Sequence, residues 1–248
     1  MMSNSNKNFK KYLLIFDFDE TIVDQDSEEE LLKLTFTKQQ YNQIISTISK
    51  LDFFEGFNYY FKLMKEKGLT LKDINNNLYK LQLSPKMLNL FNYIKKNKSK
   101  FDVVILSSCI DYSIKQVLKH YGYSDLVEQY LCTKAYVEPE KSDKLLYVPK
   151  NQFPHTCDLC SDSQCKSSEL EKFLKMKKYK KYEKKLFVCD GDNDYCPSKN
   201  VLKKGDILFP RDDHRLLNKL KQTNFRDITC DVHPWKSADE IILELEKL

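Results

Sequence analysis

The segment KYLLIFDFDET, residues 11 to 21, constrains the fold more than any other part of the chain. Its apolar run from Tyr12 to Phe16 has the length of a strand, and an apolar run without alternation is typical of a strand covered on both faces. Two carboxylates, Asp17 and Asp19, follow at once. Side chains two apart in an extended segment point the same way, so we expect these carboxylates to project together from the end of a buried parallel strand, with Phe18 turned back into the core.

Further apolar runs end in the same manner. The run from Asp102 to Leu106 is expected to stop at two serines, and the run from Lys185 to Cys189 at an acidic loop. The polar residues at these ends are Ser107, Ser108, Asp190 and Asp194. Segments with helical spacing separate the runs, which predicts a doubly wound α/β domain with a parallel sheet. Such sheets bind ligands at the carboxyl ends of their strands, where these residues would gather.

Helical signals define the expected domains. From Asp24 to about Leu83 the sequence has helical spacing and no good strand candidate, so we expect a helical cap at residues 25–83. The catalytic core would comprise residues 11–24 and 84–248, after a disordered lead at residues 1–10. Capping boxes at Ser27 and Ser237, each with Glu three positions later, and a first-turn proline, Pro85, predict helix starts.

Composition excludes several classes of protein. The chain has 248 residues, 41% hydrophobic and 31% charged, which suits a soluble folded protein. No run approaches the roughly 18 apolar residues of a membrane span, and the polar N-terminus lacks an apolar targeting segment, so we expect a cytoplasmic protein with no membrane partner. The net charge of +5 is spread along the chain and is weak evidence for a nucleic-acid partner. The eight cysteines are expected to be free thiols or metal ligands.

The acidic residues at the strand ends indicate a metal. Neighbouring carboxylates raise each other's pKa unless a cation intervenes, and oxygen ligands without histidine favour Mg²⁺ over zinc. A Mg²⁺ site beside a free carboxylate suits phosphoryl transfer, in which one Asp attacks phosphorus and a second manages the proton. A hydroxyl such as Ser107 and a lysine would hold the phosphoryl oxygens. The pattern therefore predicts a phosphatase that forms an aspartyl-phosphate.

Several motifs together resemble a known family. Asp17-Phe18-Asp19-Glu20-Thr21 is similar to the D-x-D-x-T signature of haloacid dehalogenase superfamily phosphatases, whose hydroxyl and acidic motifs correspond to Ser107 and to residues 190–194. The segments Leu83-Ser84-Pro85, His155-Thr156-Cys157-x-x-Cys160-x-x-x-x-Cys165-Lys166, Asp190 to Pro197 and Val232-His233-Pro234-Trp235 extend the resemblance to the phosphoethanolamine/phosphocholine phosphatases and their pyridoxal phosphate phosphatase relatives. It spans nearly the whole chain from Tyr12 onward.

The resemblance implies a role for each matching residue. Asp17 would be the nucleophile and Asp19 the general acid and base. Thr21, Ser107 and Ser108 would contact the phosphate, with Lys166 as the charge-neutralising lysine. The metal set implied is Asp17, Asp19 through its main-chain carbonyl, Asp190 and Asp194. The fold implied is a Rossmann-like core with a helical cap that closes over a small phosphomonoester, phosphoethanolamine or phosphocholine first and pyridoxal 5′-phosphate as the alternative.

One departure from the family pattern concerns the substrate. The relatives usually carry Asp and Asn just after the motif serine, whereas this chain has Ser108-Cys109-Ile110. An acidic residue there would be well placed to meet an amine of the substrate, and Asp111 is a candidate to replace it. The acidic run from Asp24 to Glu30 and the cap aromatics are a second candidate for a cationic head group, but helix capping is the stronger explanation for the glutamates and core packing the default for the aromatics.

The cysteine cluster supports a rival hypothesis from another class. His155, Cys157, Cys160 and Cys165 lie at short spacing and are compatible with a zinc knuckle, but the spacing is not a standard finger pattern. We therefore favour reduced cysteines that pack the loop before Lys166. With the basic stretch from Lys172 to Lys185, a zinc knuckle would allow a non-enzymatic module that binds zinc and RNA. The complete set of phosphatase motif residues favours the enzyme. The sequence leaves the oligomeric state open.

Overall fold

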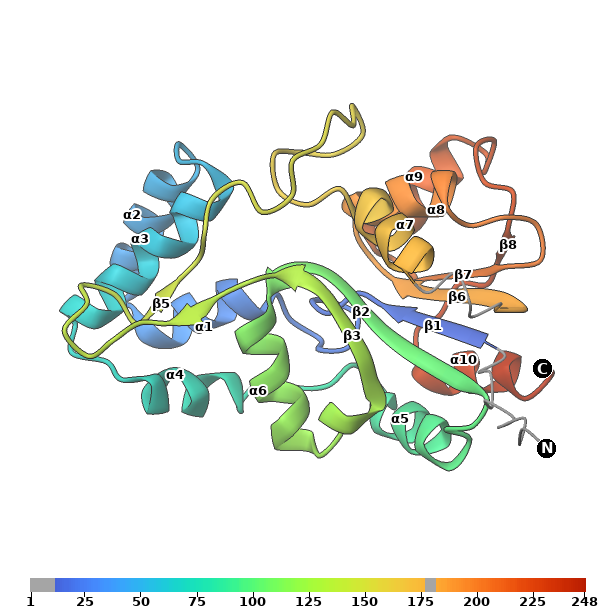
Figure 1. Cartoon of the computed structure of the whole chain (residues 1–248), viewed down its shortest axis with the longest axis horizontal. Helices are drawn as coiled ribbons and strands as arrows, with labels where there is room; N and C mark the ends of the chain where they lie inside the picture. The colour runs from blue at the N-terminus through green and yellow to red at the C-terminus, as the bar shows by residue number, and fades with distance from the viewer. Residues whose placement is uncertain (1–11, 177–181) are drawn as a thin grey trace, which may run out of the picture.

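A six-stranded parallel sheet forms the centre of the computed structural model, which describes residues 12–176 and 182–248 (Figure 1). The strand order is β3-β2-β1-β6-β7-β8, and every pairing in this sheet is parallel. The strands are β1 (Tyr12–Phe16), β2 (Phe101–Ile110), β3 (Val127–Thr133), β6 (Lys184–Cys189), β7 (Ile207–Pro210) and β8 (Asp231–Val232). The doubly wound α/β prediction is therefore confirmed. The predicted disordered lead lies outside the described residues.

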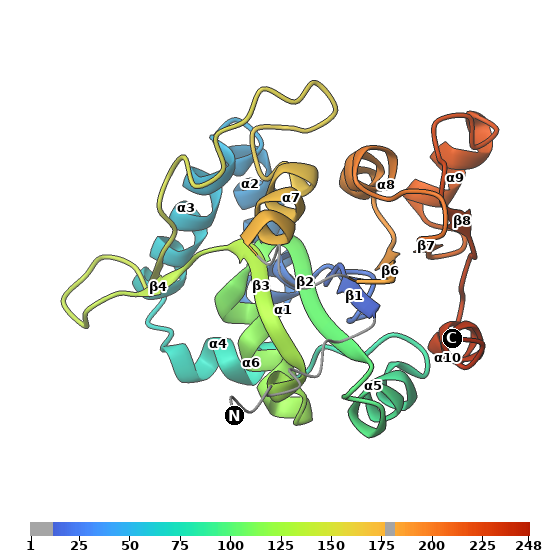
Figure 2. The same cartoon turned by 45° about the vertical axis from the view of Figure 1, so that its right-hand side comes forward.

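Helices cover both faces of this sheet (Figure 2). One face carries α7 (Lys166–Met176), α8 (Tyr195–Asn200) and α9 (Arg215–Gln222), and the other α5 (Met87–Lys96), α6 (Asp111–Tyr121) and α10 (Ala238–Leu245). Two short 3-10 helices, η1 (Ser124–Leu126) and η2 (Asp192–Asp194), complete the core. Within the described ranges, no helix combines the length and the apolar character that a membrane crossing requires.

The two faces explain the unbroken apolar run of β1. Leu13 and Ile15 pack in one buried cluster with Leu170 and Phe173 of α7, whereas Leu14 and Phe16 pack in the other with α5, α6 and α10. Side chains alternate across a strand, so a strand covered on both faces is apolar at every position.

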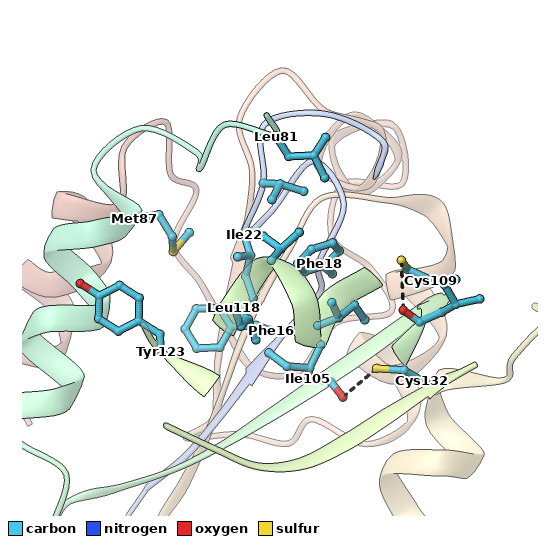
Figure 3. Close-up of a cluster of buried hydrophobic side chains, with 14 of the residues drawn as sticks. Phe16, Phe18, Ile22, Leu81, Met87, Ile105, Cys109, Leu118, Tyr123 and Cys132 are labelled. Carbon is cyan, nitrogen blue, oxygen red and sulfur yellow. Dashed lines mark hydrogen bonds between the residues drawn. The ribbon is translucent and has the colours of Figure 1, made fainter. Parts of the chain in front are cut away.

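Phe18 continues the alternation beyond the strand. Figure 3 shows Phe16, Phe18 and Ile22 within one buried cluster. The cluster also contains Leu81, which is more than 50 positions further along the chain. Phe18 is fully buried, as predicted. Burial of an aromatic side chain of this size contributes about 1.5 to 3 kcal/mol, so Phe18 anchors the loop that carries the acidic pair.

Four helices follow β1 before the chain returns to the core. They are α1 (Ser27–Thr35), α2 (Lys38–Ile48), α3 (Phe53–Glu66) and α4 (Leu71–Leu78). An antiparallel bridge between Val23 and Leu83 joins the two ends of this insertion, and the amide of Asp24 donates to the Gln82 carbonyl at 2.8 Å. The described part of residues 25–83 is thus helical, as expected, while the division of the chain into core and cap stays a prediction.

A small antiparallel hairpin, β4 (Tyr136–Val137) with β5 (Leu146–Tyr147), lies against α3 and was not expected from the sequence. Asn58 of α3 fastens the chain just after it. Its Nδ2 donates to the Val148 carbonyl at 2.7 Å and its Oδ1 accepts from the Val148 amide at 2.9 Å. The inserted helices therefore have a second connection to the chain that follows β3.

Several predicted element boundaries need correction. The N-cap of α1 is Asp26, which accepts from the amide of Glu29, whereas Ser27 is buried and its hydroxyl lies 3.3 Å from Cys109 Sγ. Pro85 belongs to a turn, because Lys86, with a left-handed φ of 61°, precedes the first helical residue of α5. Strand β2 does not stop at Ser107 but continues, with an irregular register, to Ile110. The capping box at Ser237 is confirmed.

Candidate active site

The carboxyl ends of β1 and β6 lie side by side, because the two strands pair in parallel with Phe16 opposite Val188. The residue after each strand is an aspartate, and the amide of Asp17 donates to the Val188 carbonyl at 2.9 Å. Asp17 continues the alternation of Leu13 and Ile15 and so faces α7. The topology thereby brings Asp17 and Asp190, which are far apart in sequence, to one edge of the sheet.

Lys166, the first residue of α7, joins two of the buried carboxylates. Its Nζ lies 2.7 Å from Asp17 Oδ2 and 2.6 Å from Asp194 Oδ1, and its side chain is fully buried. Burial alone disfavours the charged amine, but the charges of Asp17 and Asp194 outweigh it and raise the pKa of Lys166 above its usual range. Lys166 therefore carries its charge at any physiological pH.

Three buried carboxylates form one group. Asp17, Asp190 and Asp194 each place an oxygen within 4.8 Å of the others. Burial, followed by the charges of Asp17 and Asp194, raises the pKa of Asp190 to about 9, and burial raises that of Asp194 to about 7 in spite of Lys166. Hydrogen bonds orient them: Thr21 Oγ1 donates to Asp190 Oδ1 at 3.0 Å, and the Gly191 amide to Asp194 Oδ2 at 2.9 Å.

This group has the chemistry of a magnesium site. When all three carboxylates are ionised, the single ammonium group of Lys166 leaves two negative charges uncompensated among these four residues. Burial is the first cause of the raised pKa values of Asp190 and Asp194, and the neighbouring carboxylates add to it. A hard divalent cation with oxygen ligands removes the charge deficit, so the residues present fit Mg²⁺.

The carboxylate of Asp19 does not join this group, which corrects the expectation that Asp17 and Asp19 project together. Its Oδ1 accepts from the amide of Ser27 at 2.9 Å, and it lies within 4.8 Å of Glu28 and Cys109 atoms. The alternation continues past β1 to Phe18, but the chain enters a turn at Asp19, so the alternation of an extended chain does not reach Asp19. Burial, with the charges of Glu28 and Asp26, raises the pKa of Asp19 well above its usual range.

The hydroxyl residues take different positions. Ser107 is buried and its Oγ accepts from the amide of Cys109 at 3.2 Å. Ser108 is partly exposed and its carbonyl accepts from Thr133 Oγ1 at 2.7 Å. The hydroxyl hydrogen of Thr21 is directed to Asp190. A direct contact of these three residues with a phosphate stays a prediction. Thr21 also contacts one of the three buried carboxylates, that of Asp190.

Asp111 is not placed to replace the missing acid after Ser107. Its carboxylate is buried at the start of α6, where it accepts from Lys115 Nζ at 2.7 Å, from Lys134 Nζ at 3.3 Å and from the amide of Ala135 at 3.1 Å. The contacts with Lys134 and Ala135 fasten the start of α6 to the chain that follows β3. Asp111 therefore has a structural role.

The acidic residue that contacts the segment after Ser107 is Glu28, which lies in the first turn of α1. Its Oε1 accepts from the amide of Ile110 at 3.4 Å, next to Cys109 and Asp19. Burial, with the charge of Asp26, raises the pKa of Glu28 to about 8. The sequence placed Glu28 in an acidic run, but helix capping was the stronger explanation for the glutamates of that run.

A cavity of about 390 Å³ opens beside Glu28. Acidic and aromatic side chains dominate its wall, among them Asp26, Glu28, Glu29, Asp52, Tyr41, Phe53, Phe57 and Tyr60. The hydroxyl of Tyr60 is buried and has no hydrogen-bond partner among the described residues. Its pKa is raised well above the usual range, first by burial and then by the charge of Glu28. The cavity combines negative charge with aromatic faces, which suits an organic cation.

Solved structures with this fold are phosphatases and related hydrolases. A substrate-bound phosphoserine phosphatase superposes with a TM-score of 0.59 at 16% identity, over 95% of this chain and 98% of its own. The hydrolase YfnB from Bacillus subtilis, described as bound to magnesium, has a TM-score of 0.51 at 15% identity, over 96% of this chain and 99% of its own. The chain therefore has the fold of the haloacid dehalogenase hydrolases.

The chain belongs to the family described as "Putative Phosphatase", which it matches over residues 12–248. It is 27% identical to the human phosphoethanolamine/phosphocholine phosphatase, over 96% of this chain and 89% of that protein. It is 30% identical to the human pyridoxal phosphate phosphatase PHOSPHO2, over 96% of this chain and 98% of that protein. Membership decides against the non-enzymatic zinc and RNA module, whose predicted basic stretch lies partly outside the described residues.

Proposed function

We propose that this phosphatase is a Mg²⁺-dependent phosphomonoesterase that acts on a small phosphorylated metabolite in the cytoplasm. One observation carries the proposal: the Asp17 carboxylate lies 2.7 Å from the buried ammonium of Lys166 and within the group formed by Asp190 and Asp194. Mg²⁺ would be held by Asp17, Asp190, Asp194 and the Asp19 main-chain carbonyl, and it would supply charge neutralisation for the phosphate.

The reaction would proceed in two displacements at phosphorus. An Asp17 oxygen attacks, the bond from phosphorus to the ester oxygen breaks, and Asp19 gives its proton to the leaving alcohol. Asp19 then removes a proton from water as the water oxygen attacks the aspartyl-phosphate, which releases inorganic phosphate and restores both carboxyl groups. The raised pKa of Asp19 supports the first role, because a general acid must be protonated when the ester arrives.

The remaining polar residues would hold the phosphoryl oxygens. Lys166 offers its charge from the α7 face. The bond that Ser107 Oγ accepts from Cys109 uses a lone pair, which leaves the hydroxyl hydrogen to donate to a phosphoryl oxygen. Ser108 and Thr21 would complete this contact, Thr21 from beside Asp190.

The cavity beside Glu28 favours an amine-bearing substrate. Glu28 and Asp19 are half-buried near each other and both have raised pKa values, so an ammonium group between the cavity and the loop would favour their ionised forms. The rings of Phe53, Phe57 and Tyr60 would contact the carbon atoms or methyl groups of that cation. Phosphoethanolamine and phosphocholine fit this description. Pyridoxal 5′-phosphate is the alternative, since the aromatic wall also suits a flat ring.

Phosphate release from a panel of phosphomonoesters tests the proposal directly. Wild-type protein should release phosphate only with Mg²⁺ and should prefer phosphoethanolamine or phosphocholine to glycerol phosphate. Asp17→Asn should abolish turnover because the amide is a poor nucleophile, while its thermal unfolding remains cooperative. Glu30→Gln, in the same helix turn as Glu28 but outside the cavity wall, serves as the matched control and should keep full activity. Substantial turnover by Asp17→Asn would refute the nucleophile assignment.

A further inference from the structure

Four cysteines from two separate segments converge beside the active site. Cys157, Cys160 and Cys165 lie on the irregular loop before α7, and Cys196 lies in the first turn of α8. Each sulfur is within 4.8 Å of the other three. Figures 1 and 2 show this loop as a long excursion between β5 and α7 that ends against the core. The fourth cysteine is remote in sequence, so the local spacing did not reveal it.

The sulfur positions match a tetrahedral metal site. The Sγ atoms of Cys157 and Cys196 are 3.6 Å apart, and those of Cys165 and Cys196 are 4.0 Å apart. Four sulfurs at about 2.3 Å from a zinc ion in a tetrahedron are separated by about 3.8 Å. A disulfide would bring two sulfurs to about 2.05 Å, so these are reduced thiols. We infer that Cys157, Cys160, Cys165 and Cys196 bind one structural zinc ion as thiolates.

The ligand set differs from the one that the sequence suggested, because His155 is otherwise engaged. Its Nδ1 accepts from the Cys157 amide at 3.2 Å, and its Nε2 lies 3.0 Å from the Ser161 carbonyl, which can only accept. Both ring nitrogens are therefore used, and His155 shapes the loop rather than binding the metal. Four thiolates with no carboxylate or imidazole select zinc over Mg²⁺, which prefers oxygen.

Donors surround the sulfur of Cys196 as expected around a metal-bound thiolate. Ser167 Oγ lies 2.9 Å from it, and Asn200 Nδ2 donates to it at 3.5 Å. Hydrogen bonds of this kind disperse the negative charge of a ligand and fix its orientation. Cys157 and Cys160 are only half-buried, whereas cysteines that serve core packing are usually fully buried. Both observations favour a bound metal over simple packing.

The position of the cluster gives the metal a structural purpose. No helix or strand occurs in the described chain between Tyr147, where β5 ends, and Lys166, and loops of such length are uncommon without a constraint. Cys165 directly precedes Lys166, and Cys196 follows Asp194 by two residues. Zinc would thus fix the two backbones whose side chains form the 2.6 Å ion pair of Lys166 with Asp194.

Metal analysis of the full-length protein tests this inference independently of catalysis. After purification without chelators, inductively coupled plasma mass spectrometry should find about one zinc per chain. Cys196→Ser should lose most of that zinc, whereas Cys230→Ser, a buried cysteine outside the cluster, should retain it. Loss of zinc should also lower the thermal unfolding temperature of the protein.

A second measurement needs no variant. Wild-type protein exchanged with Co²⁺ should show the intense visible bands and the sulfur-to-cobalt charge-transfer absorption of a tetrahedral thiolate site. Protein with negligible zinc whose Co²⁺ spectrum lacks that absorption, or mass spectra that show disulfides among these cysteines, would overturn the inference. Since metal content and spectra do not depend on turnover, this result is distinguishable from a failure of the proposed phosphatase reaction.

Discussion

The hydroxyl of Thr21 donates a 3.0 Å hydrogen bond to Asp190 Oδ1, across 169 positions of sequence. Thr21 is fully buried and belongs to the loop after β1, while Asp190 belongs to the loop after β6. The bond therefore links the loop after β1, which carries Asp17, to the group formed by Asp17, Asp190 and Asp194. It also fixes which Asp190 oxygen is left to face a cation.

The first prediction concerns this bond. Thr21→Val keeps the shape of the side chain but removes the donor, so the Mg²⁺ concentration for half-maximal activity should rise roughly 10- to 100-fold, as is typical when a partner of a metal ligand is lost. Activity against Mg²⁺ concentration measures the effect. Thr21→Ser retains the hydroxyl and should restore most of the affinity. An unchanged Mg²⁺ requirement in Thr21→Val would mean that Thr21 does not orient a metal ligand.

The second prediction concerns stability without metal. In the folded protein the pKa of Asp190 is about 9 and that of Asp194 about 7, whereas unfolded aspartates lose their protons near pH 4. Between these values the folded state binds more protons than the unfolded state, so stability falls as the pH rises. In EDTA the unfolding temperature should therefore decrease from about pH 5 to about pH 9.

Magnesium and a variant provide the controls for that experiment. Mg²⁺ compensates the same charges that protons compensate, so saturating Mg²⁺ should reduce the pH dependence. Asp190→Asn removes one of the titrating groups and should also flatten the curve in EDTA. If the unfolding temperature in EDTA rose with pH over this range, the charge deficit of the three carboxylates would not govern stability.

Much of the fold was accessible from sequence because the informative patterns are local. The apolar runs that became β1, β2 and β6 were visible, since strands buried on both faces contain few polar residues. The strands β3 and β8 and the hairpin of β4 with β5 were missed. Strands β4, β5 and β8 are only two residues long and β3 is half-polar, so their pairing depends on neighbours that are remote in sequence.

The site was predicted in its composition but less well in its geometry. Asp17, Lys166, Asp190 and Asp194 were all named, and the sheet topology brings them together. The predicted direction of the Asp19 side chain was wrong because the chain enters a turn at Asp19, where strand alternation no longer applies. Cys196 was missed because it reaches the other three cysteines from a separate segment, α8, that no short motif connects to them. Glu28 was part of the acidic run considered for a cationic head group, but its contact with the Ile110 amide was not expected.

The third prediction concerns substrate selection by Glu28. Glu28→Gln keeps the acceptor for the Ile110 amide but removes the carboxyl group that would ionise beside a bound substrate ammonium. The KM for phosphoethanolamine should rise roughly 10- to 100-fold, because a hydrogen bond to a charged group contributes about 1.5 to 3 kcal/mol. The KM for glycerol phosphate, which lacks the cation, should change little. Parallel loss on both substrates would assign Glu28 to the fold or to catalysis rather than to selection.

The fourth prediction concerns Lys166, which we expect to contribute both to stability and to catalysis. Lys166→Met leaves Asp17 and Asp194 without their buried cation, and removal of one member of a buried ion pair costs about 3 to 5 kcal/mol of stability. Activity should fall by about two orders of magnitude or more, because the charge also faces the phosphate.

A double variant, Lys166→Met with Asp194→Asn, separates the loss of stability from the loss of activity. It removes a negative charge together with the positive one, so chemical denaturation should recover a large part of the lost free energy of unfolding. Phosphate release should stay as low as in Lys166→Met, because neutralising Asp194 does not return a cation to the nucleophile. Recovery of both stability and turnover would mean that Lys166 acts only by balancing Asp194, and the 2.7 Å contact with Asp17 would then have no catalytic meaning.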